Sequence, residues 1–175
     1  MTADTQRKST LKLVLVACIS VVLVAISLIG AILAFSGEST MFAGNRPTTI
    51  GIQSSGELAP CPGTPNCVNS KAQDAEHAIK PLSYSSNPEQ AMANLKTVID
   101  NMERTTIIAS TNIYLYAEFK SKLMGFVDDV EFLLDEKEGV IQVRSASRLG
   151  KSDLGVNRKR IEAIRAELSK LQSNA

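Results

Sequence analysis

The densest cluster of basic, hydroxyl and amide side chains in the chain lies between residues 144 and 160. Residues 144–170 carry eight basic and three acidic side chains, although the whole chain is nearly balanced, with 19 Lys and Arg against 18 Asp and Glu. Residues 157–160, Asn-Arg-Lys-Arg, are predicted to begin a helix. Cations in a first helical turn oppose the helix dipole by about 0.3–1 kcal/mol each, so this run needs compensation.

Two sources of compensation are compatible with this pattern. In the first, the carboxylates of Asp128 and Asp153 pair with the cations, which is the commoner cause of such clusters. In the second, an anionic ligand binds at the helix start, where free backbone N–H groups and serine hydroxyls add donors. The candidate ligand-binding residues are the charged, hydroxyl and amide side chains around this position: Asp128, Arg144, Ser145, Ser147, Arg148, Ser152, Asp153, Asn157, Arg158 and Arg160.

A hydrolase-like enzyme is the alternative interpretation of the same residues. One of the serines of the 144–160 loop would act with Asp128 or Asp153. The chain has a single histidine, His77, and no Gly-x-Ser-x-Gly nucleophile motif, which argues against this chemistry. We therefore predict a non-enzymatic module, without a cofactor, that binds an anionic ligand or a protein partner. A structural domain that docks a partner on an open sheet face is a third hypothesis.

Two consecutive strands, 127–134 and 140–147, are predicted to position this cluster. Only one register keeps their apolar residues on one face, and it pairs Leu134 with Ile141 and Phe132 with Val143. The register leaves a four-residue turn between the strands, which is a common hairpin length.

The same register fixes the acidic residues of the hairpin. It places Glu131 directly across from Arg144 and Asp129 diagonal to Arg148, and such cross-strand pairs contribute about 0.2–1 kcal/mol each. We interpret Asp129, Glu131 and Arg144 as a solvated charge ladder. Asp128 lies on the apolar side of its strand, at the edge of the core, and therefore needs a partner.

The remaining periodicity predicts an α+β domain with the order α-β-β-β-β-α. Asn87 is a suitable N-cap and Pro88 a suitable first helical residue, and apolar residues then recur at helical spacing up to Met102. The predicted strands cover 105–110, 114–120, 127–134 and 140–147, and the second helix covers 157–172. This order predicts two layers, an antiparallel sheet with the helices packed on one face.

A short loop near the start of the domain contains three prolines and two cysteines, Cys61 and Cys67. The prolines and Gly63 preset the loop to bring its ends together, which favours a structural disulfide outside the cytoplasm. A metal site or a redox role are the alternatives, although Cys-x5-Cys is not a standard spacing for either. We predict no metal site and interpret His77 as a hydrogen-bonded structural residue.

The amino-terminal region predicts a membrane anchor. Residues 13–35 contain no charge and are long enough to cross a bilayer as a helix. Basic residues precede this stretch, so residues 1–12 are expected in the cytoplasm. The length of the stretch favours an uncleaved signal anchor, and cleavage near residues 34–36 remains an alternative.

The rest of the chain is accordingly expected outside the cytoplasm, in the periplasm of a cell with the anchor in its inner membrane. Residues 36–57 are rich in Gly, Ser and Thr and predict a flexible linker, and residues 58–175 form the globular domain. The balanced charge and an aromatic content of 5%, without Trp, argue against nucleic-acid binding.

Several motifs together resemble one family. They are Pro60-Cys-Pro-Gly-Thr-Pro-Asn-Cys-Val-Asn-Ser70, Gly125-Phe-Val-Asp-Asp-Val-Glu-Phe132, Val143-Arg-Ser-Ala-Ser-Arg148 and Asp153-Leu-Gly-Val-Asn-Arg-Lys-Arg-Ile-Glu162. Over about residues 58–171 the chain is similar to the family of domains of unknown function numbered 1499, whose members occur in bacteria, often behind a membrane anchor or signal. The resemblance implies an exported location and no established activity.

Overall fold

The computed structural model describes residues 14–28 and 42–173 of the chain. The chain divides into two compact units, Met1–Ser39 and Thr40–Ala175. In the first unit, residues 14–28 form an α-helix. No helix within the described residues is both long enough and apolar enough to cross a membrane.

Several of the predicted segments fall outside this description. The predicted cytoplasmic residues 1–12 and the parts of the predicted span at 13 and 29–35 are among the residues that the structure does not describe. The first six residues of the predicted linker, 36–41, are also outside it. Only residues 14–28 of the predicted span therefore lie within the described residues.

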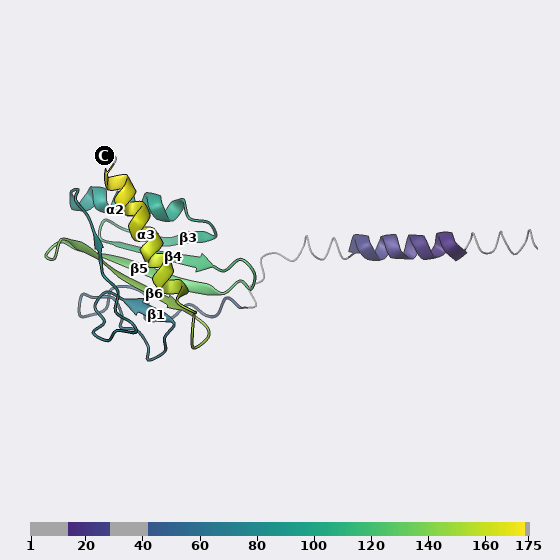
Figure 1. Ribbon diagram of the computed structural model, residues 1–175, viewed down its shortest axis with the longest axis horizontal. Coiled ribbons are helices and arrows are strands. Elements are labelled where there is room, and N and C mark those ends of the chain that lie inside the picture. Colours follow the sequence, from purple (N-terminus) through teal and green to yellow (C-terminus); the bar gives the residue numbers. More distant parts are fainter. Residues whose placement is uncertain (1–13, 29–41, 174–175) are drawn as a thin grey trace, which may run out of the picture. The chain divides into compact units, whose positions relative to one another are not determined.

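The second unit is built on one antiparallel sheet (Figure 1). The strands follow the order β1-β6-β5-β4-β3, and β2 pairs with the other half of β6. The bounds are β1 Cys67–Asn69, β2 Leu82–Ser83, β3 Thr105–Ser110, β4 Tyr114–Lys120, β5 Val127–Asp135 and β6 Val140–Ser147. The helices are α2, Pro88–Asp100, and α3, Val156–Ser173.

The predicted α+β class and antiparallel sheet are confirmed, but the predicted strand number was too low. The sequence predicts four strands, and the described residues contain six. The two additional strands, β1 and β2, have only three and two residues. A segment this short has no room for a period-two pattern of apolar residues, so its pairing with β6 depends on the tertiary structure.

Helices α2 and α3 contact each other and cover one face of the sheet. Asn87 caps α2, because its side chain accepts a hydrogen bond from the Gln90 N–H at 2.8 Å, and Pro88 takes the first helical position as predicted. The apolar stripes of both helices close on the alternating apolar residues of β4, β5 and β6. The largest fully buried side chains of this core are Phe132, Leu82, Leu95, Ile99, Leu115, Ile141, Ile161, Ile164 and Leu168.

The predicted register of the β5–β6 hairpin is confirmed. Leu134 pairs with Ile141 and Phe132 with Val143. Residues 136–139 form the turn, and Gly139 there has a φ of 66°, which L side chains rarely adopt.

The other face of the sheet, which we call the outer face, is covered by the chain that leads into the domain. The sequence predicts a flexible linker over 36–57, and the structure places 42–57, the described part, against this face. Ile50 and Leu58 pack with Tyr114, Tyr116 and Leu133 of the sheet. The Gly51 N–H donates to Glu131 Oε1 at 2.7 Å. We call residues 42–58 the entry segment.

Candidate functional site

The outer face holds a buried layer of paired charges beneath the entry segment. Glu131 at its centre is 0% exposed. Its Oε1 accepts hydrogen bonds from the Gly51 N–H at 2.7 Å and the Tyr114 hydroxyl at 2.9 Å, and its Oε2 accepts from Arg144 Nη1 at 3.1 Å. Every oxygen of this carboxylate is therefore partnered, as a buried charge requires.

Asp129 and Glu118 extend the layer toward the edge of the face. Asp129 Oδ1 accepts from Arg148 Nη2 at 2.7 Å and from the Tyr116 hydroxyl at 2.5 Å. Glu118 accepts from Arg148 on one side and from Arg46 Nε, at 2.8 Å, on the other. Counted with Glu131, Arg144 and Arg46, the last a half-exposed residue of the entry segment that closes the edge of the layer, there are three carboxylates and three guanidinium groups, so the formal charge is balanced.

The surroundings shift the pKa values of two tyrosines and of Glu118. Burial, followed by the charge of Glu131, raises the pKa of Tyr114 far above its ordinary value. Burial and the hydrogen bond to Asp129 do the same for the pKa of Tyr116. Burial would raise the pKa of Glu118, but hydrogen bonds from Arg46 and Arg148 outweigh it and lower that pKa. Neither tyrosine is therefore suited to general acid–base catalysis near neutral pH.

The predicted ion pairs of the β5–β6 hairpin are confirmed, but the prediction that they are exposed to solvent is wrong. Glu131 lies across from Arg144, and Asp129 pairs with Arg148, as the register requires. However, Asp129 and Glu131 are only 1% and 0% exposed, because the entry segment and two tyrosines cover them. Breaking such a buried pair by removing one partner costs about 3–5 kcal/mol, well above the value of an exposed pair.

On the helix-covered face, Asp128 finds the partner that its position requires. Arg160 Nη2 donates to Asp128, and the guanidinium lies 4.9 Å from the centre of the Phe119 ring. Arg160 Nη1 also donates to Asn157 Oδ1 at 2.6 Å and to Ser145 Oγ at 3.2 Å. Arg160 is thus engaged entirely within the domain.

Two other charged residues at the start of α3, Asp153 and Arg158, are also bonded within the domain. Asp153 accepts from the N–H groups of Gly155 and Asn157 at 2.9 and 2.7 Å, so it caps the helix and places a negative charge at its positive end. Arg158 donates to the backbone oxygens of Ala78 and Glu76 at 2.7 and 2.9 Å. Arg158 and Arg160 therefore have partners within the domain, and neither needs an anionic ligand to compensate its charge.

The serines of the predicted cluster have structural contacts. Ser145 is 0% exposed and its Oγ donates to Asn157 Oδ1 at 2.5 Å. Asn157 Nδ2 donates in turn to Ser147 Oγ and to the Asn66 carbonyl, both at 3.0 Å. Ser152 is exposed. Within the described residues none of these hydroxyls hydrogen-bonds to a histidine, so the geometry supplies no activating base.

The sheet divides the ten predicted ligand-binding residues into separate groups. Arg144 and Arg148 lie on the outer face, in the buried charge layer. A second group lies on the helix-covered face or at the start of α3: Asp128, Ser145, Ser147, Asn157, Arg158 and Arg160. Ser152 and Asp153 lie in the loop between β6 and α3. The structure therefore does not bring the ten residues into one pocket.

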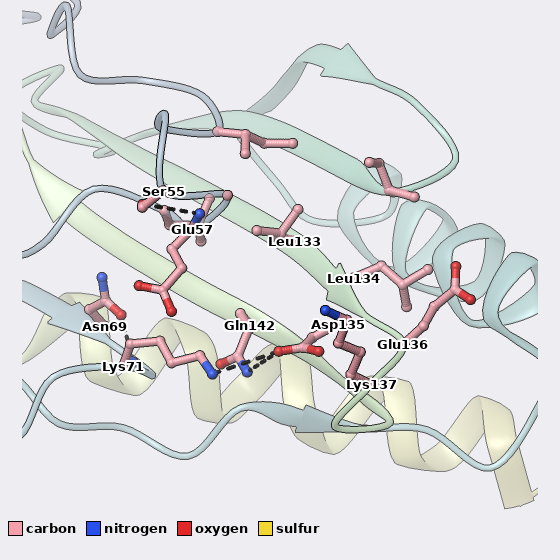
Figure 2. Close-up of a pocket in the computed structure, with 14 residues that line it drawn as sticks. Ser55, Glu57, Asn69, Lys71, Leu133, Leu134, Asp135, Glu136, Lys137 and Gln142 are labelled. Atoms are coloured by element: carbon pink, nitrogen blue, oxygen red, sulfur yellow. Dashed lines mark hydrogen bonds and ion pairs between the residues drawn. The ribbon is translucent and has the colours of Figure 1, made fainter.

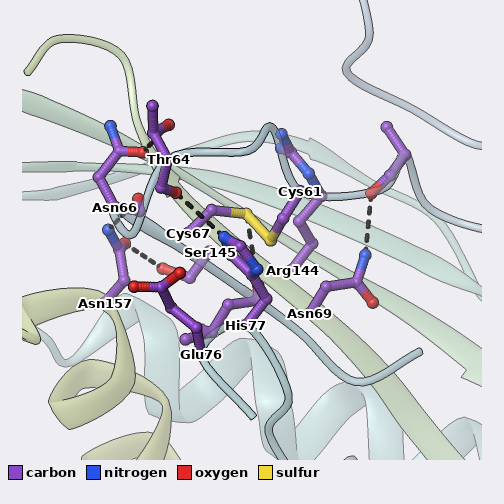
Figure 3. The surroundings of a disulfide bond; sticks show 12 residues. Cys61, Thr64, Asn66, Cys67, Asn69, Glu76, His77, Arg144, Ser145 and Asn157 are labelled. Atoms are coloured by element: carbon purple, nitrogen blue, oxygen red, sulfur yellow. Dashed lines mark hydrogen bonds between the residues drawn. A yellow bond between two sulfur atoms is a disulfide. The ribbon is translucent and has the colours of Figure 1, made fainter. Parts of the chain in front are cut away.

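Cys61 and Cys67 form a disulfide, with their Cα atoms 5.7 Å apart, as predicted (Figure 3). The loop that it closes is attached to β6, because the Ser147 N–H donates to the Asn66 carbonyl at 3.0 Å and Asn66 Nδ2 donates to the Gly150 carbonyl at 2.8 Å. The loop thus joins β1 to the cluster around Asn157.

His77 is a hydrogen-bonded structural residue, as the sequence predicts. Its Nδ1 lies 2.7 Å from Asp74 Oδ1. Its Nε2 lies 3.1 Å from the carbonyl oxygen of Thr64, which Figure 3 shows beside it. Because both ring nitrogens face acceptors, the Thr64 bond first and the Asp74 bond second raise the pKa of His77. No group of three His, Cys, Asp or Glu side chains in the described ranges could hold a metal ion.

An open groove that the sequence did not reveal lies beside the charge layer (Figure 2). Its cavity measures about 580 Å³ and lies between the 52–58 turn of the entry segment and the β5–β6 hairpin. Apolar side chains line part of it: Ile52, Leu58, Ile113, Leu133 and Leu134. Charged and amide side chains line the rest: Glu57, Asn69, Lys71, Asp135, Glu136, Lys137 and Gln142.

A second cavity, also of about 580 Å³, continues the groove toward the disulfide. The two share Ser55, Glu57, Leu58, Asn69 and Lys71 in their linings, and the second ends at Cys61 and His77. The signal for this groove was the pair of isoleucines Ile50 and Ile52 within the predicted linker, just before Leu58 at the start of the predicted domain, because a flexible linker needs no such apolar side chains.

One buried group near the disulfide is incompletely bonded. Arg144 is 4% exposed, and its Nε is the one buried side-chain nitrogen or oxygen in the described residues without a hydrogen-bond partner. Figure 3 shows its side chain in the surroundings of the disulfide. Its Nη1 still donates to Glu131, so Arg144 is ion-paired although its Nε–H has no acceptor.

The fold and this geometry define an α+β domain with a buried charge layer and an open groove on the outer face of its sheet. The chain belongs to the family described as "Protein of unknown function (DUF1499)", which matches residues 57–168. This finding confirms the resemblance seen in the sequence. No curated protein and no solved structure matches the chain.

Proposed function

We propose that the protein is a single-pass, membrane-anchored domain outside the cytoplasm, and that it is a non-enzymatic module that binds a polypeptide partner in the groove. The uncharged stretch 13–35 supports the anchor. The Cys61–Cys67 disulfide supports a location outside the cytoplasm, where disulfides persist.

The groove is the observation that carries the binding function. Two of its apolar side chains, Ile52 and Ile113, are 43% and 46% exposed, although both lie next to the buried Leu58 and Leu133 in the lining. Charges of both signs surround them, so the lining has no net preference for a small anion. Apolar anchors inside a polar rim are typical of protein-binding surfaces. The partner is accordingly a peptide segment with an apolar anchor and flanking charges.

The geometry favours a protein partner over the anionic ligand and the hydrolase-like alternatives. Arg158 and Arg160 already have internal partners, and Lys71 in the groove donates to Glu138 Oε1 at 2.8 Å. An anion would have to displace these bonds. A hydrolase would need a nucleophile and a base in contact, and Ser145 instead donates to Asn157.

The test is a selection of peptides from a displayed random library on the full chain in nanodiscs. We expect enriched peptides with an apolar anchor, and their affinity should fall at least about tenfold in Ile52→Glu and Ile113→Glu, since tenfold is 1.4 kcal/mol. Ile108→Glu is the matched control, because Ile108 is 38% exposed and lies outside the groove lining. Failure to enrich peptides, or equal loss in the control variant, would refute the proposal.

A further inference from the structure

One end of the sheet carries a cluster of exposed apolar side chains that the groove does not include. The β4–β5 turn contributes Leu123, 89% exposed, and Met124, 46% exposed. The loop between β6 and α3 contributes Leu149 and Leu154, which are 41% and 86% exposed. We call these residues, together with Phe42 and Phe126, the apolar tip.

Contacts join the turn, the loop and the start of the entry segment at this end. The rings of Phe42 and Phe126 lie 5.2 Å apart. The Arg148 N–H donates to the Val127 carbonyl at 3.2 Å, which holds the β6–α3 loop beside the β4–β5 turn. A Cβ at Gly44 would lie 3.0 Å from Leu149 Cγ, so the entry segment passes directly over that loop.

Leu154 has a strained backbone conformation, and its exposed side chain contributes almost no burial energy to offset that strain. Its φ is 55°, in the left-handed region, where a residue other than glycine or asparagine is strained. Burial of a leucine side chain stabilises by about 1.5–3 kcal/mol, yet Leu154 gains almost none of this within the domain. Strain combined with an exposed apolar side chain indicates a contact made outside the domain.

The charges around the apolar tip favour an anionic partner. Lys122 and Lys151 are exposed beside its leucines. The nearby carboxylates are already engaged, since Asp153 caps α3 and Asp128 pairs with Arg160. Basic side chains beside exposed apolar ones form the pattern that docks on the interface of an anionic bilayer.

The course of the chain supplies the second argument for a bilayer. The entry segment begins at Phe42, within the apolar tip, and thirteen residues separate Phe42 from Leu28. A stretch of that length spans at most about 50 Å when fully extended. If residues 13–35 cross the membrane, as the proposed function holds, this tether keeps the point where the chain enters the apolar tip within reach of the lipid.

We propose that the apolar tip docks on the lipid bilayer, with its leucines in the headgroup region and Lys122 and Lys151 on anionic headgroups. This contact would direct the groove, whose lining includes residues 133–137 at the opposite end of β5, away from the lipid. The inference rests on the proposed anchor, which keeps the domain near the membrane. The contact itself is inferred from the exposed apolar side chains and the two lysines.

The test places an environment-sensitive fluorophore on the full chain in vesicles that contain phosphatidylcholine, phosphatidylglycerol and acyl-brominated lipid. In a Cys18→Ser background, the label is attached to Leu123→Cys or Leu154→Cys, and to Lys137→Cys in the β5–β6 turn as the control at the opposite end of the sheet. We expect the first two to lose at least roughly half of their emission, because a docked apolar face lies about 5–10 Å into the interface. The control should keep its emission.

Equal quenching at all three positions, or none at 123 and 154, would overturn the proposal. Lys122→Glu with Lys151→Glu should reduce the quenching at 123, and unchanged quenching would refute the role of the lysines. Extraction of the protein with alkaline carbonate tests the anchor separately. A chain that stays in the vesicles without quenching at 123 refutes only the docked tip, whereas a chain that is extracted refutes the anchor.

Discussion

Removal of the Glu131 carboxylate should destabilise the domain more than any exposed charge could. In Glu131→Ala, Arg144 keeps a guanidinium whose side chain is only 5% exposed and loses its ion-pair partner. The Gly51 N–H and the Tyr114 hydroxyl lose their acceptor in the same change. A broken buried pair costs about 3–5 kcal/mol, and the orphaned donors place the expected loss at the upper end of that range.

The assay is urea unfolding of the full chain in detergent, followed by tyrosine emission, since the chain has three Tyr and no Trp. Glu131→Met combined with Arg144→Met is the matched control, because replacing both charges by apolar groups of similar size is often neutral. The double variant should recover most of the loss. A loss below about 1 kcal/mol in Glu131→Ala, the range of exposed pairs, would refute the burial of this ion pair.

Two further predictions concern the disulfide loop. The raised pKa of His77 means that its protonated ring contributes stability that is complete below the unfolded value of 6.5 and is lost as the pH rises through the higher folded value. His77→Gln should therefore weaken the pH dependence of the unfolding free energy between about pH 6 and 8. An unchanged slope would contradict the raised pKa of His77. Changing Cys61 and Cys67 together to serine should lower the unfolding free energy by about 2 kcal/mol in the same urea assay, and no loss would show that the loop is held without the bond.

The sequence was most informative where apolar residues alternate along long strands. Phe132, Leu134, Ile141 and Val143 permit one register, and this register also determined which charges of β5 and β6 meet. The N-cap at Asn87 could also be predicted from the sequence, because helix capping depends on a few neighbouring residues.

The burial of the charge layer could not be predicted from the strands themselves. The outer face of β5 carries Asp129 and Glu131, and an alternating pattern of this kind normally marks a solvated face. Its cover comes from the entry segment, which has no secondary-structure period and lies some 80 residues earlier, as in the Gly51–Glu131 bond. The groove was missed for the same reason, since Ile52 and Leu58 of that segment line it.

The entry segment also determines how the domain responds to mechanical load. A force applied to the chain before Phe42 reaches the sheet through this segment, whose hydrogen bonds to the sheet come from Arg46 and Gly51. These bonds are separated along the chain and would be loaded one after another, whereas the ladders between β4, β5 and β6 share their load across many bonds. The segment would therefore detach at a lower force than the sheet unfolds. Its detachment would expose Glu131 to water and convert a buried, balanced layer into an open charged surface.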